Sequence, residues 1–160
     1  EPAVHRSRLQ ACRLRQGSLS ARRMAAPILM AASAAIILAL GLVHLLYTFR
    51  GEKLTPRDPM LQAAMRMVSP VISRDTTMWK AWVGFNASHS LGAILFGLVY
   101  GYLALAESAF LFASPFLLAV GLGLLGSLAA LGHAYWFSIP FRGICLALAC
   151  YVAAIAMAWN

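Results

Sequence analysis

The chain has 160 residues, of which 61% are hydrophobic and 11% are charged, and its formal net charge is +8. A soluble domain is roughly 45–50% apolar and about 25% charged, so this composition excludes a small water-soluble globular protein. The positive charge does not indicate nucleic-acid binding, because the basic residues lie in a tail and in one connection between apolar segments. The composition therefore indicates an integral membrane protein.

Residues 1–23 form a basic segment with six Arg and one Glu, and the first methionine follows at Met24. Three interpretations are open: a basic disordered tail, an Arg-rich targeting segment, or an artefact of the start site. We favour the start-site artefact, because a compact apolar protein begins at Met24. His5 in this segment is expected to have no role.

Four apolar segments are long enough to cross a bilayer, which requires about 20 apolar residues per helix. We expect spanning helices at about residues 25–49, 77–106, 115–137 and 140–158. The first is too long for the apolar region of a signal peptide, which has about 7–15 residues. The sequence therefore predicts an all-α fold, an integral membrane four-helix bundle that forms a single domain over residues 24–160.

The connection between the first two spans contains an amphipathic pattern at about residues 58–69. Asp58 can cap a helix there, and Pro59 suits its first position. The apolar positions repeat at helical spacing, as Met60, Leu61, Ala64, Met65 and Val68. Such a stripe most often lies on the membrane interface or on its own bundle, so we expect an interfacial helix.

The second span carries the densest polar cluster of any apolar segment in the chain, with Asn86, Ser88, His89 and Ser90. Polar side chains at membrane depth cost free energy unless they find partners, so they should face other helices or a cavity. The same span has two lines of small residues, which let helices approach closely in lipid. We expect helix packing at Gly84, Ser88 and Gly92, and at Gly97 and Gly101.

If the chain crosses the membrane four times, the C-terminal ends of the first and third spans lie on the side of the membrane that carries the 50–76 connection. His44 and His133 lie near these ends, and His89 lies in the same half of the second span. The sequence therefore predicts a polar pocket between helices on this side. Its candidate residues are His44, Asn86, His89, Ser90, His133, Tyr135 and Arg142.

Two classes of function are open for this pocket. The first is a non-enzymatic accessory or small-ligand-binding subunit. The second is a redox protein that binds haem b or a metal through two of His44, His89 and His133. The sequence has no intramembrane carboxylate, which argues against a pump, and no catalytic or nucleotide-binding motif. Metal ligands are not assigned, because neither HxxxH nor ExxH occurs.

The run MWKAWVGFNASHSLGAILFGLVYGY contains the pattern G-F-N-x-S-H-S-x-G at residues 84–92. It resembles the signature of a family of small, uncharacterised four-helix bacterial membrane proteins. GLVHLLYTF and HAYWFSIP are similar to other recurring pieces of that family, so the resemblance covers about Met24 to the C-terminus. The resemblance implies four transmembrane helices in the bacterial inner membrane, and it implies no activity. Residues 1–23 have no counterpart in the family's pattern.

Basic residues near the helix ends predict the orientation of the chain. Those on the side of the 50–76 connection are Arg50, Lys53, Arg57, Arg66, Arg74, Lys80 and Arg142. If translation begins at Met24, the positive-inside rule places the connection in the cytoplasm and both termini outside. If residues 1–23 belong to the protein, their six Arg make the balance nearly even. The expected partners are the lipid bilayer and a homodimer or larger membrane complex, and no nucleic acid is expected.

Overall fold

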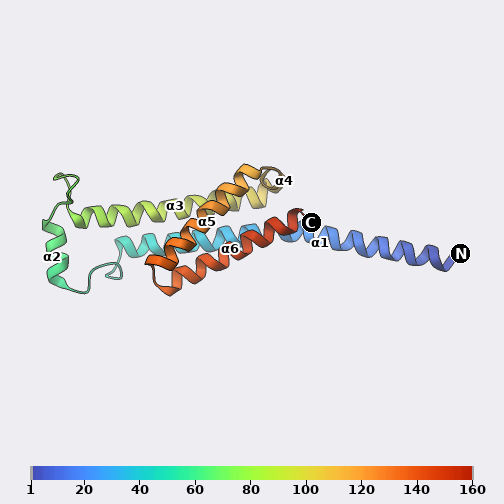
Figure 1. Ribbon diagram of the computed structural model, residues 1–160, viewed down its shortest axis with the longest axis horizontal. Coiled ribbons are helices and arrows are strands. Elements are labelled where there is room, and N and C mark those ends of the chain that lie inside the picture. Colours follow the sequence, from blue (N-terminus) through green and yellow to red (C-terminus); the bar gives the residue numbers. More distant parts are fainter. Residues whose placement is uncertain (1, 160) are drawn as a thin grey trace.

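The computed structural model describes the backbone of residues 2–159 and the side chains of residues 24–159. The described chain forms six helices and no strand, so the predicted all-α fold is confirmed. In chain order they are α1 (Pro2–Phe49), α2 (Pro59–Met67), α3 (Met78–Ala106), α4 (Ser108–Ala113), α5 (Pro115–Tyr135) and α6 (Ser138–Trp159). The four long helices run along one another, and α2 crosses one end of them (Figure 1).

Four helices of the described chain are long and apolar enough to cross a membrane: residues 24–49 of α1, and all of α3, α5 and α6. Their bounds lie within two residues of those expected from the sequence. The protein is therefore a multi-pass membrane protein. The sequence did not predict α4, because six residues are too few to show a helical period.

The backbone of residues 2–23 continues α1, which extends beyond the rest of the bundle at its N-terminal end (Figure 1). The side chains of residues 1–23 lie outside the described part of the structure. The three interpretations given above, a disordered tail, a targeting segment or a start-site artefact, all fall on this segment, whose side chains the structure does not describe. The start-site interpretation refers to translation, and it stays a prediction.

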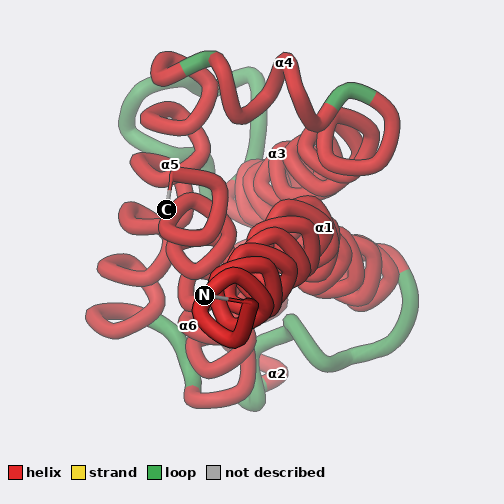
Figure 2. The backbone as a smooth tube through the Cα atoms, turned by 90° about the vertical axis from the view of Figure 1, so that its right-hand side faces the viewer, coloured by secondary structure: helices red, strands yellow, loops and turns green. Residues whose placement is uncertain are grey.

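α1 is the central helix of the bundle, because it packs along both α3 and α6, whereas α5 packs mainly on α6 (Figure 2). Its buried side chains Met30, Ala34 and Ile37 repeat at helical spacing. They meet aromatic residues of α3 and α6, among which Tyr151 is completely buried. The first span therefore organises the core, and the second span contacts it along one face.

Small residues set the distance between α1 and α3. A Cβ atom at Gly97 would lie 2.6 Å from Leu38 Cβ and 2.9 Å from the Ala34 carbonyl oxygen. Real Cβ contacts are longer, so the backbones could not approach this closely with alanine at 97. Gly101 lies one turn further along, where a Cβ atom would make an ordinary contact with Ala34 Cβ at 3.8 Å.

The other predicted line of small residues does not contact another helix of this chain. A Cβ atom at Gly84 or Gly92 would meet nothing within 4 Å in the described structure. Ser88 is exposed, and its hydroxyl donates a hydrogen bond to the Phe85 carbonyl oxygen of its own helix at 3.0 Å. These residues lie away from the face of α3 that meets α1, which corrects the expected packing role.

Two buried tyrosines attach α5 to the rest of the bundle. The Tyr100 hydroxyl of α3 donates to the Leu117 carbonyl oxygen at 2.6 Å. The Tyr151 hydroxyl of α6 donates to the Leu118 carbonyl oxygen at 3.0 Å. Gly121 makes room for them, because a Cβ atom there would collide with the Tyr151 side chain. Polar groups thus fix the position of α5 within an apolar core.

Candidate functional site

A polar cluster lies between α1 and α3 near the end of the bundle that carries the 50–77 connection. His44 Nε2 and Asn86 Oδ1 are 3.0 Å apart, and this hydrogen bond joins the two helices. Asn86 Nδ2 donates to the Trp82 carbonyl oxygen at 2.8 Å, and Ser90 Oγ donates to the Asn86 carbonyl oxygen at 2.8 Å. The structure therefore brings together His44, Asn86 and Ser90 as the sequence predicted.

The Asn86 amide determines the proton position on His44. A backbone carbonyl only accepts hydrogen bonds, so the Asn86 amide nitrogen faces the Trp82 carbonyl and its oxygen faces His44. Because an amide oxygen also only accepts, His44 Nε2 must carry the proton and donate it. In the neutral ring, Nδ1 of His44 then carries the lone pair.

His89 connects this cluster to the end of α5. Its ring meets the His44 ring edge to face, with centroids 5.5 Å apart, and the Trp136 ring in the same way at 5.1 Å. Phe85, one turn earlier on α3, stacks on it at 6.5 Å. Sequence reasoning did not select Trp136. The sequence offers no clear signal for it, because the buried positions 118, 121, 125 and 132, whose helical spacing continues to 136, are visible only in the structure.

Three predicted pocket residues lie apart from this cluster. His133 is exposed, and its ring contacts Phe141 with centroids 5.7 Å apart. Tyr135 and Arg142 are also exposed. The His133 ring therefore lies against α6 at the end of α5, and Tyr135 is the exposed last residue of α5, so neither side chain contacts the cluster between α1 and α3. The expectation of one pocket with three histidines was based on depth alone, and the structure corrects it.

The histidine geometry does not fit haem b. A haem plane must lie between its two axial rings, but the rings of His44 and His89 are in direct edge contact. The Nε2 atom of His44 already bonds Asn86, and neither ring lines the cavity beside Asn86. The described side chains also contain no group of three or more His, Cys, Asp or Glu residues that could hold a metal ion.

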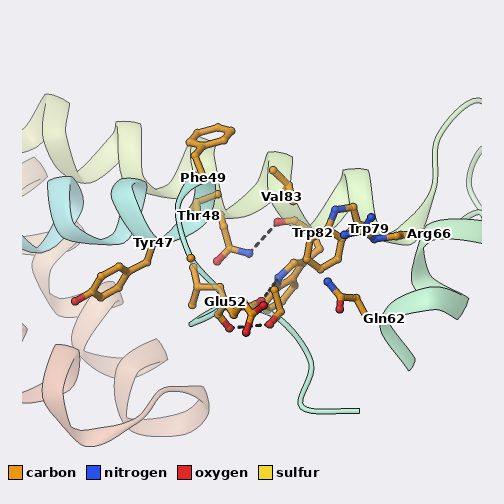
Figure 3. Close-up of a pocket in the computed structure, with 13 residues that line it drawn as sticks. Tyr47, Thr48, Phe49, Glu52, Gln62, Arg66, Trp79, Trp82 and Val83 are labelled. Carbon is orange, nitrogen blue, oxygen red and sulfur yellow. Dashed lines mark hydrogen bonds between the residues drawn. The ribbon is translucent and has the colours of Figure 1, made fainter. Parts of the chain in front are cut away.

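A cavity of about 370 Å³ lies next to the polar cluster, at the end of the bundle that carries the 50–77 connection (Figure 3). Its walls come from the end of α1, the loop that follows it, one face of α2 and the first turns of α3. Asn86 lines the cavity and also bonds His44, so one side chain belongs to both parts of the site. Other polar and aromatic lining residues include Thr48, Glu52, Gln62, Arg66, Trp79 and Trp82.

Hydrogen bonds attach the cavity walls to α3. Trp82 Nε1 donates to the Leu54 carbonyl oxygen at 3.0 Å, which holds the loop after α1 against α3. The Met78 amide donates to the Val68 carbonyl oxygen at 2.8 Å, which joins the end of α2 to the start of α3. Asp58 caps α2, as the sequence predicted, by accepting from the Met60 amide at 2.9 Å.

The cavity carries one acidic and one basic group on different walls (Figure 3). Glu52 comes from the loop after α1, and Arg66 comes from α2. The Arg66 guanidinium lies over the Trp79 ring, 5.2 Å from its centroid, and it makes no ion pair with a described carboxylate. Both charges therefore remain available to a ligand.

No protein family, curated protein or solved structure matches this chain in the comparisons. The resemblance to small four-helix bacterial membrane proteins stays a prediction that rests on the sequence pattern at residues 84–92.

Proposed function

We propose that this chain is a non-enzymatic accessory subunit of the membrane that binds a small zwitterionic ligand in the cavity beside Asn86. The observation that carries the proposal is a cavity of about 370 Å³ with Glu52 and Arg66 on different walls. Small-molecule sites commonly enclose about 300–1,000 Å³ and combine aromatic walls with a few polar groups. Trp79 and Trp82 supply the aromatic surface here.

The charges of the cavity support a ligand with two opposite charges. A purely anionic ligand would be repelled by Glu52, and a purely cationic ligand would be repelled by Arg66. A ligand that carries an ammonium group and a carboxylate or phosphate can pair with both Glu52 and Arg66. The Gln62 amide lines the same cavity and makes no hydrogen bond to another described side chain, so it can contribute a donor and an acceptor.

The polar cluster supports the inner wall of this cavity. Asn86 is held by His44 on one side and by the Trp82 backbone on the other, so its amide has a fixed orientation. A fixed side chain loses little entropy when a ligand binds. In this proposal His44 and His89 position a wall residue, and they do not perform chemistry themselves.

Thermal unfolding in detergent tests the proposal, with phosphocholine, phosphoethanolamine and glycine betaine as probes. Binding of a probe raises the unfolding temperature in a concentration-dependent way, and at 100 times the Kd it contributes about 2.7 kcal/mol. Glu52→Gln and Arg66→Gln each remove one charge–ligand interaction, so each should weaken the apparent affinity about tenfold.

The matched control is Arg57→Gln, because Arg57 is an exposed cation of the same connection that does not line the cavity. Its affinity for the probes should equal that of the unchanged protein. The proposal is wrong if no probe shifts the unfolding temperature, or if the control weakens binding as much as the two cavity variants do.

The kind of membrane and the orientation of the chain in it are proposed from the family resemblance and from the basic residues. The resemblance implies the bacterial inner membrane. If translation begins at Met24, the seven Lys and Arg residues on the side of the connection favour a cytoplasmic cavity by the positive-inside rule. Accessory subunits act with other chains, and a homodimer or larger membrane complex remains part of this proposal.

A further inference from the structure

α2 presents its polar side to the protein and its apolar side outward. Gln62 and Arg66, which are four residues apart, line the cavity. Met60, Ala63, Ala64 and Met67 follow the spacing of the opposite helical face, and all four are exposed. Met60 retains 82% and Met67 83% of their surface, and no residue of α2 is buried. A helix on a water-facing surface normally has the reverse arrangement.

The exposed apolar surface continues beyond the end of α2. Val71 and Ile72 lie in the turn that follows and are almost completely exposed. Two adjacent exposed β-branched side chains enlarge the apolar patch of α2, and a contiguous patch of this kind marks a membrane or protein contact. The surface formed by Met60, Ala63, Ala64, Met67, Val71 and Ile72 is named the outer face of α2 below.

The position of α2 relative to the spanning helices indicates what covers this face. α2 runs across the end of the long helices, as a helix in the membrane plane would (Figure 1). The Met78–Val68 backbone hydrogen bond fixes its end at the level where α3 begins. Trp79 and Trp82 lie in the first turns of α3, and tryptophan is enriched at the depth of the lipid headgroups.

The charges around α2 are unbalanced. Arg57, Arg74 and Lys80 are exposed and make no side-chain ion pair within the described residues. The neighbouring carboxylates take part in local turns instead: Asp58 caps α2, and Asp75 accepts from the Ser73 hydroxyl at 3.1 Å. Cations beside an exposed apolar face complement a surface that combines acyl chains with anionic headgroups.

We propose that the outer face of α2, together with Arg57, Arg74 and Lys80, docks on the anionic headgroup layer of the leaflet beside the connection. In this position α2 lies between lipid and cavity, with its apolar side in the membrane interface and its polar side on the cavity. The proposal concerns the lipid contact only, and it does not depend on the ligand of the cavity.

A fluorescent label at position 67 tests this docking. The whole chain, with its three native cysteines changed to Ala, receives Met67→Cys and an environment-sensitive fluorophore, and is reconstituted as single copies in nanodiscs. Spin-labelled lipids with a quencher near the headgroup report contact. The label should be quenched in discs that contain anionic phosphatidylglycerol. The matched control is Lys53→Cys, because Lys53 is exposed in the same connection but lies outside the outer face, and its label should stay in water.

The charge contribution is tested by Arg57→Gln combined with Arg74→Gln, which leaves the cavity lining unchanged. Each cation near an anionic surface contributes about fivefold to the docking equilibrium, so this variant should lose most of the extra quenching seen with anionic lipid. Arg57 and Arg74 are both exposed and make no side-chain ion pair within the described residues, so unfolding temperatures in detergent should not change.

Two results would overturn the proposal. A label at position 67 that remains in water in anionic nanodiscs would show that lipid does not cover the outer face. A label that becomes shielded only when two copies share one disc would assign this face to a second copy of the chain.

Discussion

At the scale of single residues, Asn86 lines the cavity and also uses both ends of its amide in hydrogen bonds of the polar cluster. Its oxygen accepts from His44 of α1, and its nitrogen donates to the Trp82 carbonyl oxygen. The histidine bond links two helices, whereas the backbone bond lies within α3. Removal of the His44 side chain or of the Asn86 side chain should therefore loosen the contact between α1 and α3.

A double-mutant cycle with His44→Ala and Asn86→Ala measures this contact. Interhelical hydrogen bonds in membrane proteins contribute about 0.6 kcal/mol on average and up to about 1.7 kcal/mol, so the coupling should lie in this range. The measurement is unfolding in detergent for the two single variants and the double variant. Ser88→Ala serves as the control, because Ser88 is exposed and bonds only its own helix. Strictly additive effects at 44 and 86 would contradict the hydrogen bond.

Substitution of two glycines of α3 by alanine should change the stability of the protein in opposite directions. Gly97→Ala forces a Cβ atom against Leu38 and should destabilise the protein by about 1–3 kcal/mol. Gly92→Ala meets open space and should stabilise the helix by about 0.5–1 kcal/mol. Unfolding in detergent compares the pair. Equal effects at the two positions would contradict the close approach of α1 and α3.

The sequence could predict which residues are polar at membrane depth, but it could not predict which way they face. Asn86 and Ser90 share the buried face of α3, so both were found. His133 has a similar depth, yet α5 packs on α6 through a different face. Gly84, Ser88 and Gly92 repeat every four residues, as Gly97 and Gly101 do, and only the contact with α1 distinguishes the two lines.

At the scale of elements, α5 depends on polar attachment as well as on apolar packing. Its glycines give it little side-chain volume, so the Tyr151 hydroxyl bond to Leu118 limits how it can slide on α6. Helix bounds were predictable, because caps and prolines mark them: Thr77 accepts from the Lys80 amide at 3.3 Å, and Pro115 begins α5. The choice of neighbouring helix was not predictable, because each span has apolar residues on most of its faces.

Tyr151→Phe tests the attachment of α5. The change removes one buried hydrogen bond with almost no change of volume, so it should destabilise the protein by about 0.5–1.5 kcal/mol. The control is Tyr102→Phe, because Tyr102 is exposed on α3 and its hydroxyl has no partner in the described chain. Unfolding temperatures in detergent compare the two variants. A larger loss at 102 than at 151 would contradict a structural role for the Tyr151 hydroxyl.

At the scale of the whole molecule, four spans divide the protein into two ends with different chemistry. One end carries the 50–77 connection, the cavity, α2 and the turn between α5 and α6. The other end carries α4 and Trp159 at the end of α6 (Figure 1). The unpaired cations beside α2 lie at the first end. Ligand binding and lipid docking are both proposed at the first end, so both require that this end lies on one side of the membrane.

Labelling of single cysteines by a membrane-impermeant reagent tests the division most directly. In a background without the native cysteines, the positions are Lys53→Cys in the connection, Phe137→Cys between α5 and α6, and Glu107→Cys beside α4. Four spans predict that residues 53 and 137 react from one side of the membrane and residue 107 from the other. A cytoplasmic connection further predicts that only residue 107 reacts in intact cells. Reaction of residues 53 and 107 from the same side would contradict the four-span arrangement and the account of the site built on it.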